Sequence, residues 1–431
     1  MKMRGEIMNE KYIINDICDV GSSKRIYLSE YQDSGIPFYR GKEIIEKDSN
    51  KEISNELFIS QERYNEIKEK FGVPKKGDIL MTAVGTIGIS WYVNEEDFYF
   101  KDGNLIWFKN FKKDIVNSRY LYYIFKSKIF SEIIKNISIG STQKAITIEQ
   151  VKKIELEFPK IEIQNKIVKI LDNISNKIKL NNEINNNLQE LINNIFISKF
   201  VNYYGYTGEY ETTEIGDIPS NWKVDNLGNV ISFSNGYGWN SKDMLENNQP
   251  GTYKVFKMGN IKIGGGINKE KTRSWILKEK CTGLEQFLSK KGDILMCMTD
   301  MKSSENPLLG HTALIDCDDE FVINQRVGII RCDKDIRWPY IYTMTNLPFF
   351  INNIRSKAHS GVQVNLTTSG IRDTKVLIPD KDSLEEFCKN VTPMYEEMFI
   401  LNNEIEKLEE LRDTLLPKLM NGEIGLDNIE I

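Results

Sequence analysis

Histidine is scarce in this sequence, and its cysteines are not paired. Only His311 and His359 occur among 431 residues, and the six cysteines show no CxxC spacing. A structural zinc site and a disulfide framework are therefore not expected. There is no run of about 18 apolar residues, which excludes a membrane-spanning helix. The opening MKMRGEIMNEK lacks the apolar stretch of a secretion signal, so we expect a cytoplasmic protein that binds no metal.

The motifs of common enzyme sites are absent as well. The sequence contains no GxxxxGK(S/T) phosphate loop, no HExxH, no GxSxG and no (D/N)PP(Y/F) tetrapeptide. The glycine-rich string GNIKIGGG at 259–266 has no following helix signal and favours a hairpin. Acidic clusters at 95–97 and 318–320 are more simply solvated loops than metal ligands. We therefore assign no catalytic residue to this chain.

Charge is unevenly distributed along the sequence. The formal net charge is −5, from 57 basic and 62 acidic side chains. The net charge is +1 over residues 1–159, +2 over 160–205, +1 over 206–379 and −9 over 380–431. The acidic total therefore reflects the last segment and leaves nucleic-acid binding by the others open.

The sequence repeats itself at an interval of about 215–220 residues. The identical string KKGDILM occurs at 75–81 and 290–296, and LNNEI occurs at 180–184 and 401–405. Weaker matches at similar offsets join GSTQKAIT to SGVQVNLT and IPFYRGKEI to YKVFKMGNI. Solenoid repeats span roughly 20–50 residues, so this interval indicates a duplicated domain.

The globular part of each copy reads as a mixture of helices and strands. Residues 60–70 predict a short helix capped by its first serine, and 272–288 occupy the same place in the second copy. KKGD predicts a turn into a buried strand in both copies. Aromatic-rich helices are predicted over 119–136 and 339–358, the second interrupted at Pro348.

Two long segments carry apolar residues at alternating spacings of three and four, which is typical of a coiled-coil seam. Each predicts a helix of about 35–40 residues, roughly 55–60 Å long. The two helices most simply pack on each other as an antiparallel coiled coil, and two independent surface helices are the alternative. The predicted packing positions of the first helix are Ile163, Ile167, Ile170, Ile174, Ile178, Ile184, Leu188, Leu191 and Ile195. Those of the second are Val391, Met394, Met398, Leu401, Ile405, Leu408, Leu415 and Leu419.

These features predict an α+β chain in which two duplicated globular domains are separated by two long helices. We expect a first domain over 1–159, a central helix over 160–205, a second domain over 206–379 and a C-terminal helix and tail over 380–431. Two linked weak binding domains make one tight contact when their spacing matches the spacing of their sites. This organisation suits a bivalent reader of a long polymer such as duplex DNA.

The sequence resembles the specificity subunit of type I restriction–modification systems. The resemblance covers essentially the whole chain and rests on the two-copy architecture and on several strings. These are KKGDILM, TAVGTIG after its first copy, IPSNWKVDNLGNV at 218–230 and LEELRDTLLPKLMNGEI at 408–424. FPKIEIQNKI at 158–167 is similar to the family's start of the first spacer helix. The second copy departs there, because Pro379 is followed by DKDSLEEF with no glutamine.

The resemblance implies a non-catalytic subunit with two target-recognition domains, each reading one half of a split, asymmetric sequence in double-stranded DNA. The paired helices would set the gap between the halves and dock two methyltransferase subunits. Those partners would bind S-adenosylmethionine and methylate adenine. A motor-nuclease subunit using ATP and Mg would complete the restriction enzyme. The chain itself would hold no cofactor and contact no membrane.

Base and phosphate contacts are expected from clustered polar and cationic side chains, because each recognition domain has a net charge of only +1. In the first domain the candidates are Arg40, Lys42, Thr82, Thr86, Ser141, Thr142, Gln143 and Lys144. In the second domain they are Lys257, Asn260, Lys262, Thr299, Lys302, Ser303, Gln325, Arg326, His359, Gln363 and Asn365. Each of them has the alternative role of a solvated loop residue. The loops of Gln143 and Gln363 are favoured because their polarity recurs, whereas the identical KKGDILM is expected to be scaffold.

Two other functions remain open from the residues alone. One is a methyltransferase or nuclease with an unrecognised site, and the other is a scaffold whose globular domains bind only protein. Transfer of labelled methyl groups by the isolated chain would favour the first. Lack of sequence-specific DNA retention together with a methyltransferase would favour the second.

Overall fold

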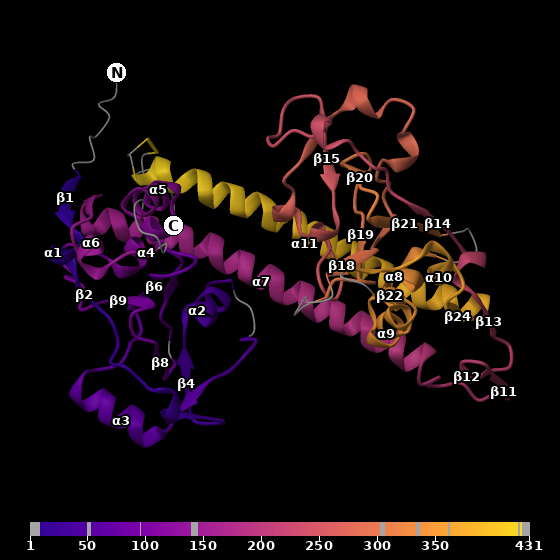
Figure 1. Cartoon of the computed structure of the whole chain (residues 1–431), viewed down its shortest axis with the longest axis horizontal. Coiled ribbons are helices and arrows are strands. Elements are labelled where there is room, and N and C mark those ends of the chain that lie inside the picture. Colours follow the sequence, from indigo (N-terminus) through magenta and orange to yellow (C-terminus); the bar gives the residue numbers. More distant parts are fainter. Residues whose placement is uncertain are drawn as a thin grey trace. The chain divides into compact units, whose positions relative to one another are not determined.

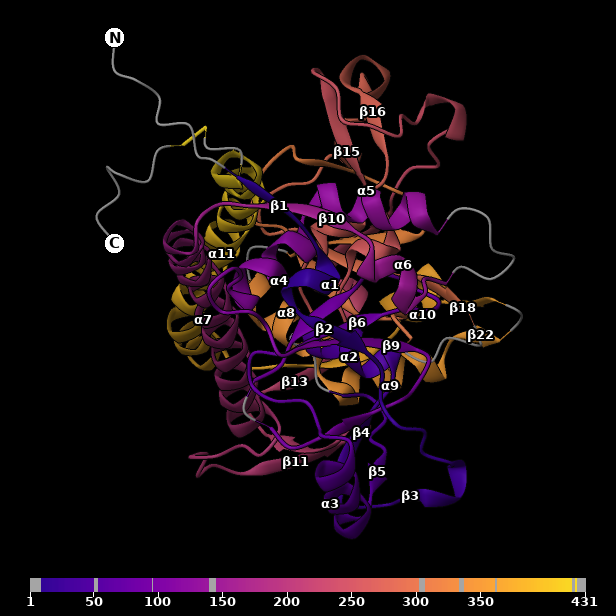
Figure 2. The same ribbon diagram turned by 90° about the vertical axis from the view of Figure 1, so that its left-hand side faces the viewer.

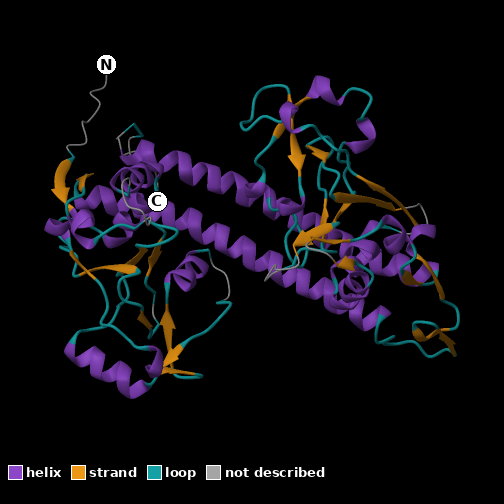
Figure 3. Ribbon diagram, viewed as in Figure 1, coloured by secondary structure: helices purple, strands orange, loops and turns teal. Residues whose placement is uncertain are grey.

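The computed structural model describes residues 9–49, 53–94, 96–138, 145–301, 307–332, 337–360, 363–420 and 423–424. Helices and strands are interspersed along the chain (Figure 3). The chain divides into two compact units: the first unit is residues 1–180 with 404–431, and the second unit is 181–403. No helix in the described part of the chain is long and apolar enough to cross a membrane.

Among its described residues, the first unit contains ten strands and all six of the short helices labelled α1 to α6 in Figure 1. Its strands are β1 (Glu10–Ile13), β2 (Asp19–Gly21), β3 (Tyr31–Gln32), β4 (Ile36–Tyr39), β5 (Phe58–Ile59), β6 (Ile79–Thr82), β7 (Ser90–Tyr92), β8 (Tyr99–Phe100), β9 (Leu105–Lys109) and β10 (Glu155–Phe158). Its short helices are α1 (Ile14–Ile17), α2 (Gly41–Asp48), α3 (Gln61–Lys70), α4 (Ser118–Lys126), α5 (Lys128–Ile137) and α6 (Ile148–Lys152).

The second unit is richer in strands. They are β11 (Tyr210–Thr213), β12 (Gly216–Pro219), β13 (Lys223–Asn226), β14 (Ile231–Asn235), β15 (Thr252–Phe256), β16 (Trp275–Leu277), β17 (Ile294–Cys297), β18 (Thr299–Met301), β19 (Thr312–Leu314), β20 (Phe321–Ile323), β21 (Val327–Cys332), β22 (His359–Ser360), β23 (Gln363–Asn365) and β24 (Lys375–Ile378). Its short α-helices are α8 (Trp338–Asn346), α9 (Pro348–Ser356) and α10 (Thr368–Arg372).

The central sheets confirm the duplication that the sequence predicts. The strand order is β2-β9-β6-β7 in the first unit and β14-β21-β17-β19 in the second. The two KKGDILM strings supply β6 and β17, which are buried at every position, as expected for scaffold strands. A parallel pair, β4 with β8 and β15 with β20, also recurs beside each central sheet. The two units therefore share the topology of the central sheet and of this parallel pair.

A pair of helices covers one face of each central sheet. In the first unit Tyr120 of α4 and Phe130 of α5 are buried in one cluster with Phe108 of β9. The sequence predicts a single helix here, but the chain turns at Ser127, whose backbone is extended and whose hydroxyl accepts a hydrogen bond from the Phe130 amide at 3.2 Å. In the second unit α9 begins at Pro348, where the interruption is predicted.

The segments before KKGDILM differ between the copies. The predicted helix over 60–70 is confirmed as α3, and its Ser60 caps the Arg63 amide at 3.1 Å. Helix α3 packs with residues of β3, β4 and β5 in one cluster, and it lies beside β4 in both views (Figures 1 and 2). The helix predicted over 272–288 is wrong, because this segment forms β16 and two short 3-10 turns. Strand β16 instead pairs with β15, which buries Ile276 against the sheet.

The two long helices, α7 (Ile161–Phe200) and α11 (Lys381–Met420), each have 40 residues. In the first unit the early part of α7 contacts the late part of α11, where Lys177 pairs with Glu404 at 3.4 Å. In the second unit the late part of α7 contacts the early part of α11, where Lys199 pairs with Glu386. The reversed order of these contacts makes the helices antiparallel, which confirms the predicted pairing.

The seam of α7 differs from the predicted one in its second half. Ile184 and Leu191 are 43% and 46% exposed, so they do not pack in the seam. Asn181, Asn185 and Ile192 are buried instead. These positions continue the alternation of three and four residues that runs through the first half of the helix, and this alternation carries two asparagines into the interior. All the other predicted packing positions on both helices are buried or half-buried.

Each long helix begins with a different set of hydrogen bonds. Gln164 of α7 is fully buried, accepts from the Asn117 amide at 2.9 Å and donates to the carbonyls of Ile115 and Pro159 at 2.8 Å. Leu384 stands at the corresponding position of α11, and Asp380 caps that helix by accepting from the Ser383 amide at 3.0 Å. The missing glutamine of the second copy is thus replaced by a local cap.

Candidate nucleic-acid interface

Two loops that are distant in sequence meet in the same way in both units. In the first unit Val84 bridges Ala145, and the Ile146 amide donates to the Ala83 carbonyl at 2.9 Å. In the second unit Thr299 pairs with Asn365 in the β18–β23 ladder. There, the Leu366 amide donates to the Met298 carbonyl at 2.9 Å. Each unit therefore joins the loop after its KKGDILM strand to its glutamine-bearing loop.

In the second unit this junction is a small three-stranded sheet, β18-β23-β22. It brings together four predicted contact residues, Thr299, Gln363, Asn365 and His359, of which the His359 side chain lies outside the described residues. Gln363 and Asn365 are exposed, whereas Thr299 is 7% exposed and donates to Asn365 Oδ1 at 2.9 Å. Thr299 thus orients the amide of Asn365, which remains accessible to a ligand.

A third turn extends this surface. Arg326 and Gln325 are exposed in the turn between β20 and β21. The Arg326 carbonyl accepts from the Met298 amide at 3.2 Å, which fixes this turn beside the junction of the other two loops. Three segments of the second unit therefore present a guanidinium and side-chain amides along one hydrogen-bonded stretch of backbone. Guanidinium and amide groups are the groups that read base edges and phosphates.

The first unit has a counterpart that the sequence did not reveal. The Asn104 carbonyl accepts from the Ala83 amide at 2.8 Å, as the Arg326 carbonyl accepts from Met298. Asn104 is half-exposed at the end of the KDGN turn before β9, so it stands at the position of Arg326. The only sequence signal was the shared place of KDGN and INQR before equivalent strands. We add Asn104 to the candidate contacts.

The other candidates of the first unit separate into buried and accessible residues. Thr82 is fully buried, donates to the Thr86 carbonyl at 2.5 Å and accepts from the Ile89 amide at 3.0 Å. These bonds shape the loop, and Thr86 remains exposed at its tip. The remaining predicted residues of this junction, with two from the second unit, lie outside the described residues: Ser141, Thr142, Gln143, Lys144, Lys302 and Ser303.

Arg40 and Lys257 occupy equivalent turns in the two units, and the backbone amide of each is capped by the side chain three residues later. The Arg40 amide donates to Glu43 at 2.7 Å, and the Lys257 amide donates to Asn260 at 2.8 Å. Glu43 is buried, which opposes its ionisation, but the hydrogen bonds from Arg40 lower the pKa of its carboxyl overall. Arg40 is therefore held by an ion pair.

The cations of these turns differ in whether their side chains are bonded within the chain or exposed to solvent. Lys257 Nζ donates to Ser274 Oγ at 2.7 Å, and Asn260 is buried against Thr272. Lys42 and Lys262, which follow in each copy, are exposed. The exposed pair therefore suits contacts to phosphate better than Arg40 and Lys257.

The KKGD turns have a structural explanation in both units. The Asp78 carboxylate accepts from the Lys75 amide at 3.0 Å and from Trp107 Nε1 at 2.8 Å, and its burial raises the pKa of this carboxyl. Asp293 accepts from the Lys290 amide at 3.0 Å and is paired with Arg331 at 2.8 Å. These carboxylates hold the start of the central strand and thereby position the loop that follows it.

Within the residues that the structure describes, one group of possible metal ligands is present, formed by Asp316, Cys317 and Glu320. Glu320 accepts from Lys254 Nζ at 2.6 Å, and Lys269 lies 3.6 Å away. Burial opposes ionisation of Glu320, but the two lysines and Cys317 lower the pKa of its carboxyl overall. Its negative charge is therefore already matched by cations of the chain.

Comparisons with known proteins agree with the duplicated geometry. The family model described as the type I restriction modification DNA specificity domain matches residues 8–190 and 219–410. The type I restriction enzyme MjaIX specificity subunit of Methanocaldococcus jannaschii is 25% identical over 96% of this chain and 93% of its own length. The HindI specificity subunit of Haemophilus influenzae is 24% identical over 81% and 87%, respectively.

A solved structure shares the fold. The crystal structure of the type I restriction–modification system S subunit from M. genitalium aligns with a TM-score of 0.56 and 16% identity. The alignment covers 97% of this chain and 98% of that chain. The architecture of two repeated α+β units with two long helices is thus also that of this neighbour.

Proposed function

The chain belongs to the type I restriction modification DNA specificity family, and we propose that it reads a bipartite, asymmetric sequence in double-stranded DNA. As a member of a family of specificity subunits, it is not itself an enzyme. One recognition domain would read each half of the target. The domains would span 1–159 and 206–379, with spacer helices over 160–205 and 380–431.

The observation that carries this proposal is the recurring loop junction. Thr299 with Asn365 and Val84 with Ala145 join equivalent loops on equivalent scaffolds, but the exposed side chains differ between the units. Two readers of different half-sites need a shared frame and unlike contact residues. This pattern favours an asymmetric target over a palindrome.

The long helices supply a surface for protein partners. Leu180, Ile184 and Leu191 are 54%, 43% and 46% exposed and share one face of α7, and Ile400 of α11 is 61% exposed. Exposed apolar side chains at helical spacing are typical of docking surfaces. The −9 charge of residues 380–431 would add electrostatic complementarity to a basic partner surface.

We propose that two adenine methyltransferase subunits bind these helices and that a motor-nuclease subunit joins them. The methyltransferases would supply S-adenosylmethionine, and the motor-nuclease would supply ATP and Mg. The specificity subunit would recognise the DNA sequence and set the spacing between the two half-sites.

Co-expression of the chain with its methyltransferase, followed by mapping of methylated adenines across the host genome, tests this function. We expect one bipartite motif with two unlike halves and a fixed gap. A palindromic motif, or methylation without sequence preference, would refute the asymmetric reading. Assembly with the methyltransferase but no DNA retention would favour the scaffold function instead.

A further inference from the structure

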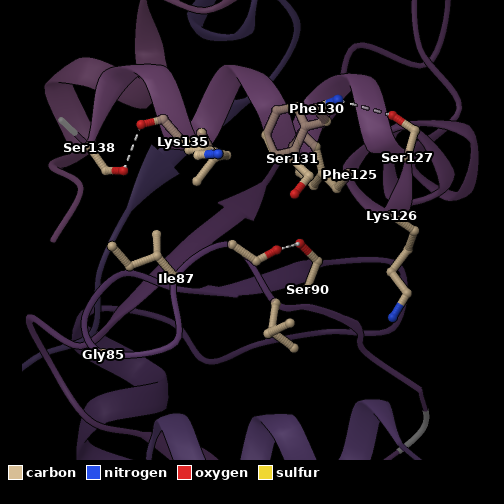
Figure 4. Close-up of a pocket in the computed structure, with 13 residues that line it drawn as sticks. Gly85, Ile87, Ser90, Phe125, Lys126, Ser127, Phe130, Ser131, Lys135 and Ser138 are labelled. Atoms are coloured by element: carbon tan, nitrogen blue, oxygen red, sulfur yellow. Dashed lines mark hydrogen bonds between the residues drawn. The ribbon is translucent and has the colours of Figure 1, made fainter. Parts of the chain in front are cut away.

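A cavity of about 710 Å³ opens in the first unit beside the loop that follows β6. Figure 4 shows the loop with Gly85 and Ile87 on one side and helix α5 on the other. Phe130 and Ile134 form an apolar floor, and Ser131 and Lys135 line the cavity from the same helix. A volume in the range of roughly 300–1,000 Å³ is typical of ligand sites.

The second unit has the same floor. A Cβ atom added to Gly88 would lie 3.3 Å from Ile134 Cγ2, and one added to Gly310 would lie 3.5 Å from Ile354 Cγ2. Phe350 is buried on α9 in the place that Phe130 has on α5. The two copies can therefore be compared residue by residue at this position.

The loop over this floor is longer in the second unit. The strand pairs Met81–Ser90 and Met296–Thr312 have the same register, but they enclose residues 82–89 in the first unit and 297–311 in the second. The end of the longer loop lies on the floor, because Leu309 is 3% exposed and packs in one cluster with Phe350 and Ile354. Ile87, at the position of Leu309, is only half-buried.

The backbone of the longer loop is also held from the helix. Arg355 of α9 donates from Nε to the Leu309 carbonyl at 2.9 Å and from Nη2 to the Pro307 carbonyl at 2.8 Å. Lys135 has the place of Arg355 on α5, and it is exposed. Within the described parts of the chain, no side-chain hydrogen bond or ion pair of Lys135 is present. Its ammonium is therefore available to bind carbonyl groups.

We propose that the cavity of the first unit binds an extended segment of a partner protein, and this inference rests on the proposed assembly with methyltransferase subunits. An aliphatic side chain of that segment packs on Phe130 and Ile134, and its backbone carbonyls accept from Lys135. The segment thereby occupies the place that the second unit fills with its own Pro307 and Leu309. The apolar floor favours a peptide over a phosphate backbone, and the other lining cation, Lys126, is already paired with Asp48 at 2.5 Å.

Site-specific photocrosslinking of the assembled complex tests this proposal. The photoreactive residue p-benzoylphenylalanine is placed at Ser131, which lines the cavity, or at Glu132, an exposed neighbour outside it. The full-length chain is mixed with purified methyltransferase subunit, with and without target duplex, and irradiated. We expect a methyltransferase crosslink from position 131 but not from 132, mapped by mass spectrometry to a segment with an aliphatic residue.

Substitutions provide a second readout that needs no crosslinker. Ser131→Trp fills the cavity from an exposed position, and Lys135→Glu removes the donor to the carbonyls. Both are expected to weaken methyltransferase binding about tenfold, as loss of a central interface contact does. Glu132→Trp should leave the affinity unchanged. Thermal unfolding of the three variants checks that each one is folded.

Three results would overturn the inference: crosslinks from position 131 to DNA only, equal crosslinks from 131 and 132, or unchanged affinity for both cavity variants. If the wild-type complex still methylates a bipartite motif in these cases, the proposed function stands and only the cavity proposal fails. If the wild-type chain neither assembles nor directs methylation, the proposed function itself fails.

Discussion

Asn185 of α7 donates from Nδ2 to Oδ1 of Asn402 on α11 at 3.1 Å, at the edge of the seam in the second unit, where Asn185 is buried and Asn402 is exposed. Asn185 is 9% exposed, and its own Oδ1 is buried without a hydrogen-bond partner. A buried asparagine in a coiled-coil seam lowers stability but penalises other registers, in which it would lose its partner. The Asn185–Asn402 pair therefore fixes how far one helix is displaced along the other.

Replacing Asn185 by leucine should have opposite effects on the stability of the chain and on the precision of the register between α7 and α11. We expect Asn185→Leu to raise the free energy of unfolding by about 1 kcal/mol, because it removes an unsatisfied buried acceptor. Sequence-specific methylation should fall, because other registers become accessible. Urea denaturation and a methylation assay on the assembled complex measure the two effects. Asn186→Leu, on the exposed side of the same turn, is the control, and lower stability of Asn185→Leu would contradict this account.

Gln164→Leu should destabilise the first unit. Leucine is the residue found at the equivalent position of α11, so the substitution removes hydrogen bonds with little change in shape. It leaves the Asn117 amide and the carbonyls of Ile115 and Pro159 without their partner. We expect a loss of about 2–3 kcal/mol in unfolding free energy. Denaturation of Gln164→Leu beside the exposed control Lys166→Ala checks this, and equal stability of both variants would refute it.

His311 should make the second unit sensitive to acid. Burial, assisted by the charge of Arg355, lowers the pKa of His311 to about 4, and its Nδ1 accepts from the Gly264 amide at 3.2 Å. The unfolded chain takes up this proton near pH 6.5, so the stabilisation present above about pH 6.5 is lost as the pH falls toward 4. The loss should approach about 3 kcal/mol.

Urea denaturation at pH 7.5 and 4.5 measures this effect. His311→Asn keeps a polar side chain that does not titrate, so its stability should change less between the two pH values than that of the parent chain. The carboxyl groups of the protein contribute equally to both chains and cancel in the comparison. The same pH dependence in both chains would exclude His311 as the cause.

Gln363→Ala should weaken recognition of one half-site only. Removal of a side-chain amide that reads a base edge costs about 1–3 kcal/mol at the affected base pair. Gln143→Ala should affect the other half in the same way. Binding to duplexes altered in one half at a time separates the two effects. Gln286→Ala, an exposed glutamine on neither loop, is the control, and unchanged methylation by both variants would remove these loops from the interface.

The two long helices should set the length of the gap between the two half-sites. Four residues inserted between Asn181 and Asn187 interrupt the alternation of three and four in α7 alone, so we expect an altered gap or no binding. Seven residues inserted at matched positions of α7 and α11 keep the seam in phase and add about 10 Å. This length corresponds to roughly three base pairs, so the tolerated gap should grow by that amount. Full activity at the original gap would show that the helices do not set it.

The sequence contained the duplication and the long helices, because an identical heptapeptide and a regular apolar spacing are local signals. It did not reveal the second half of the α7 seam, because Asn181 and Asn185 carry no hydrophobic signal. The break at Pro348 was predictable, whereas the break at Ser127 depends on one side-chain cap. The sequence predicts a helix at β16 because the pairing of this strand with β15 comes from tertiary contacts.

The candidate interface was predictable in part. The sequence predicts contacts in the glutamine loops from their recurring polarity and in the loops after KKGDILM from clustered polar side chains, but the Thr299–Asn365 and Val84–Ala145 pairs that join these loops needed the fold. The sequence predicts Thr82 as a contact residue, but Thr82 is buried and its hydroxyl holds the shape of its own loop. Asn104 was missed because its role is defined by its hydrogen bond to Ala83.

The loops after β6 and β17 differ in length by almost a factor of two, but they join strands of identical register. Doubling the length of a flexible loop costs only about 0.6 kcal/mol in closure entropy. Insertions at this place are therefore nearly neutral for folding, and the fixed strands keep them from disturbing the rest of the domain. Under the proposed function, in which these loops contact DNA, new target specificities would evolve here by a change of loop length as well as by substitution, with little selection against the intermediates.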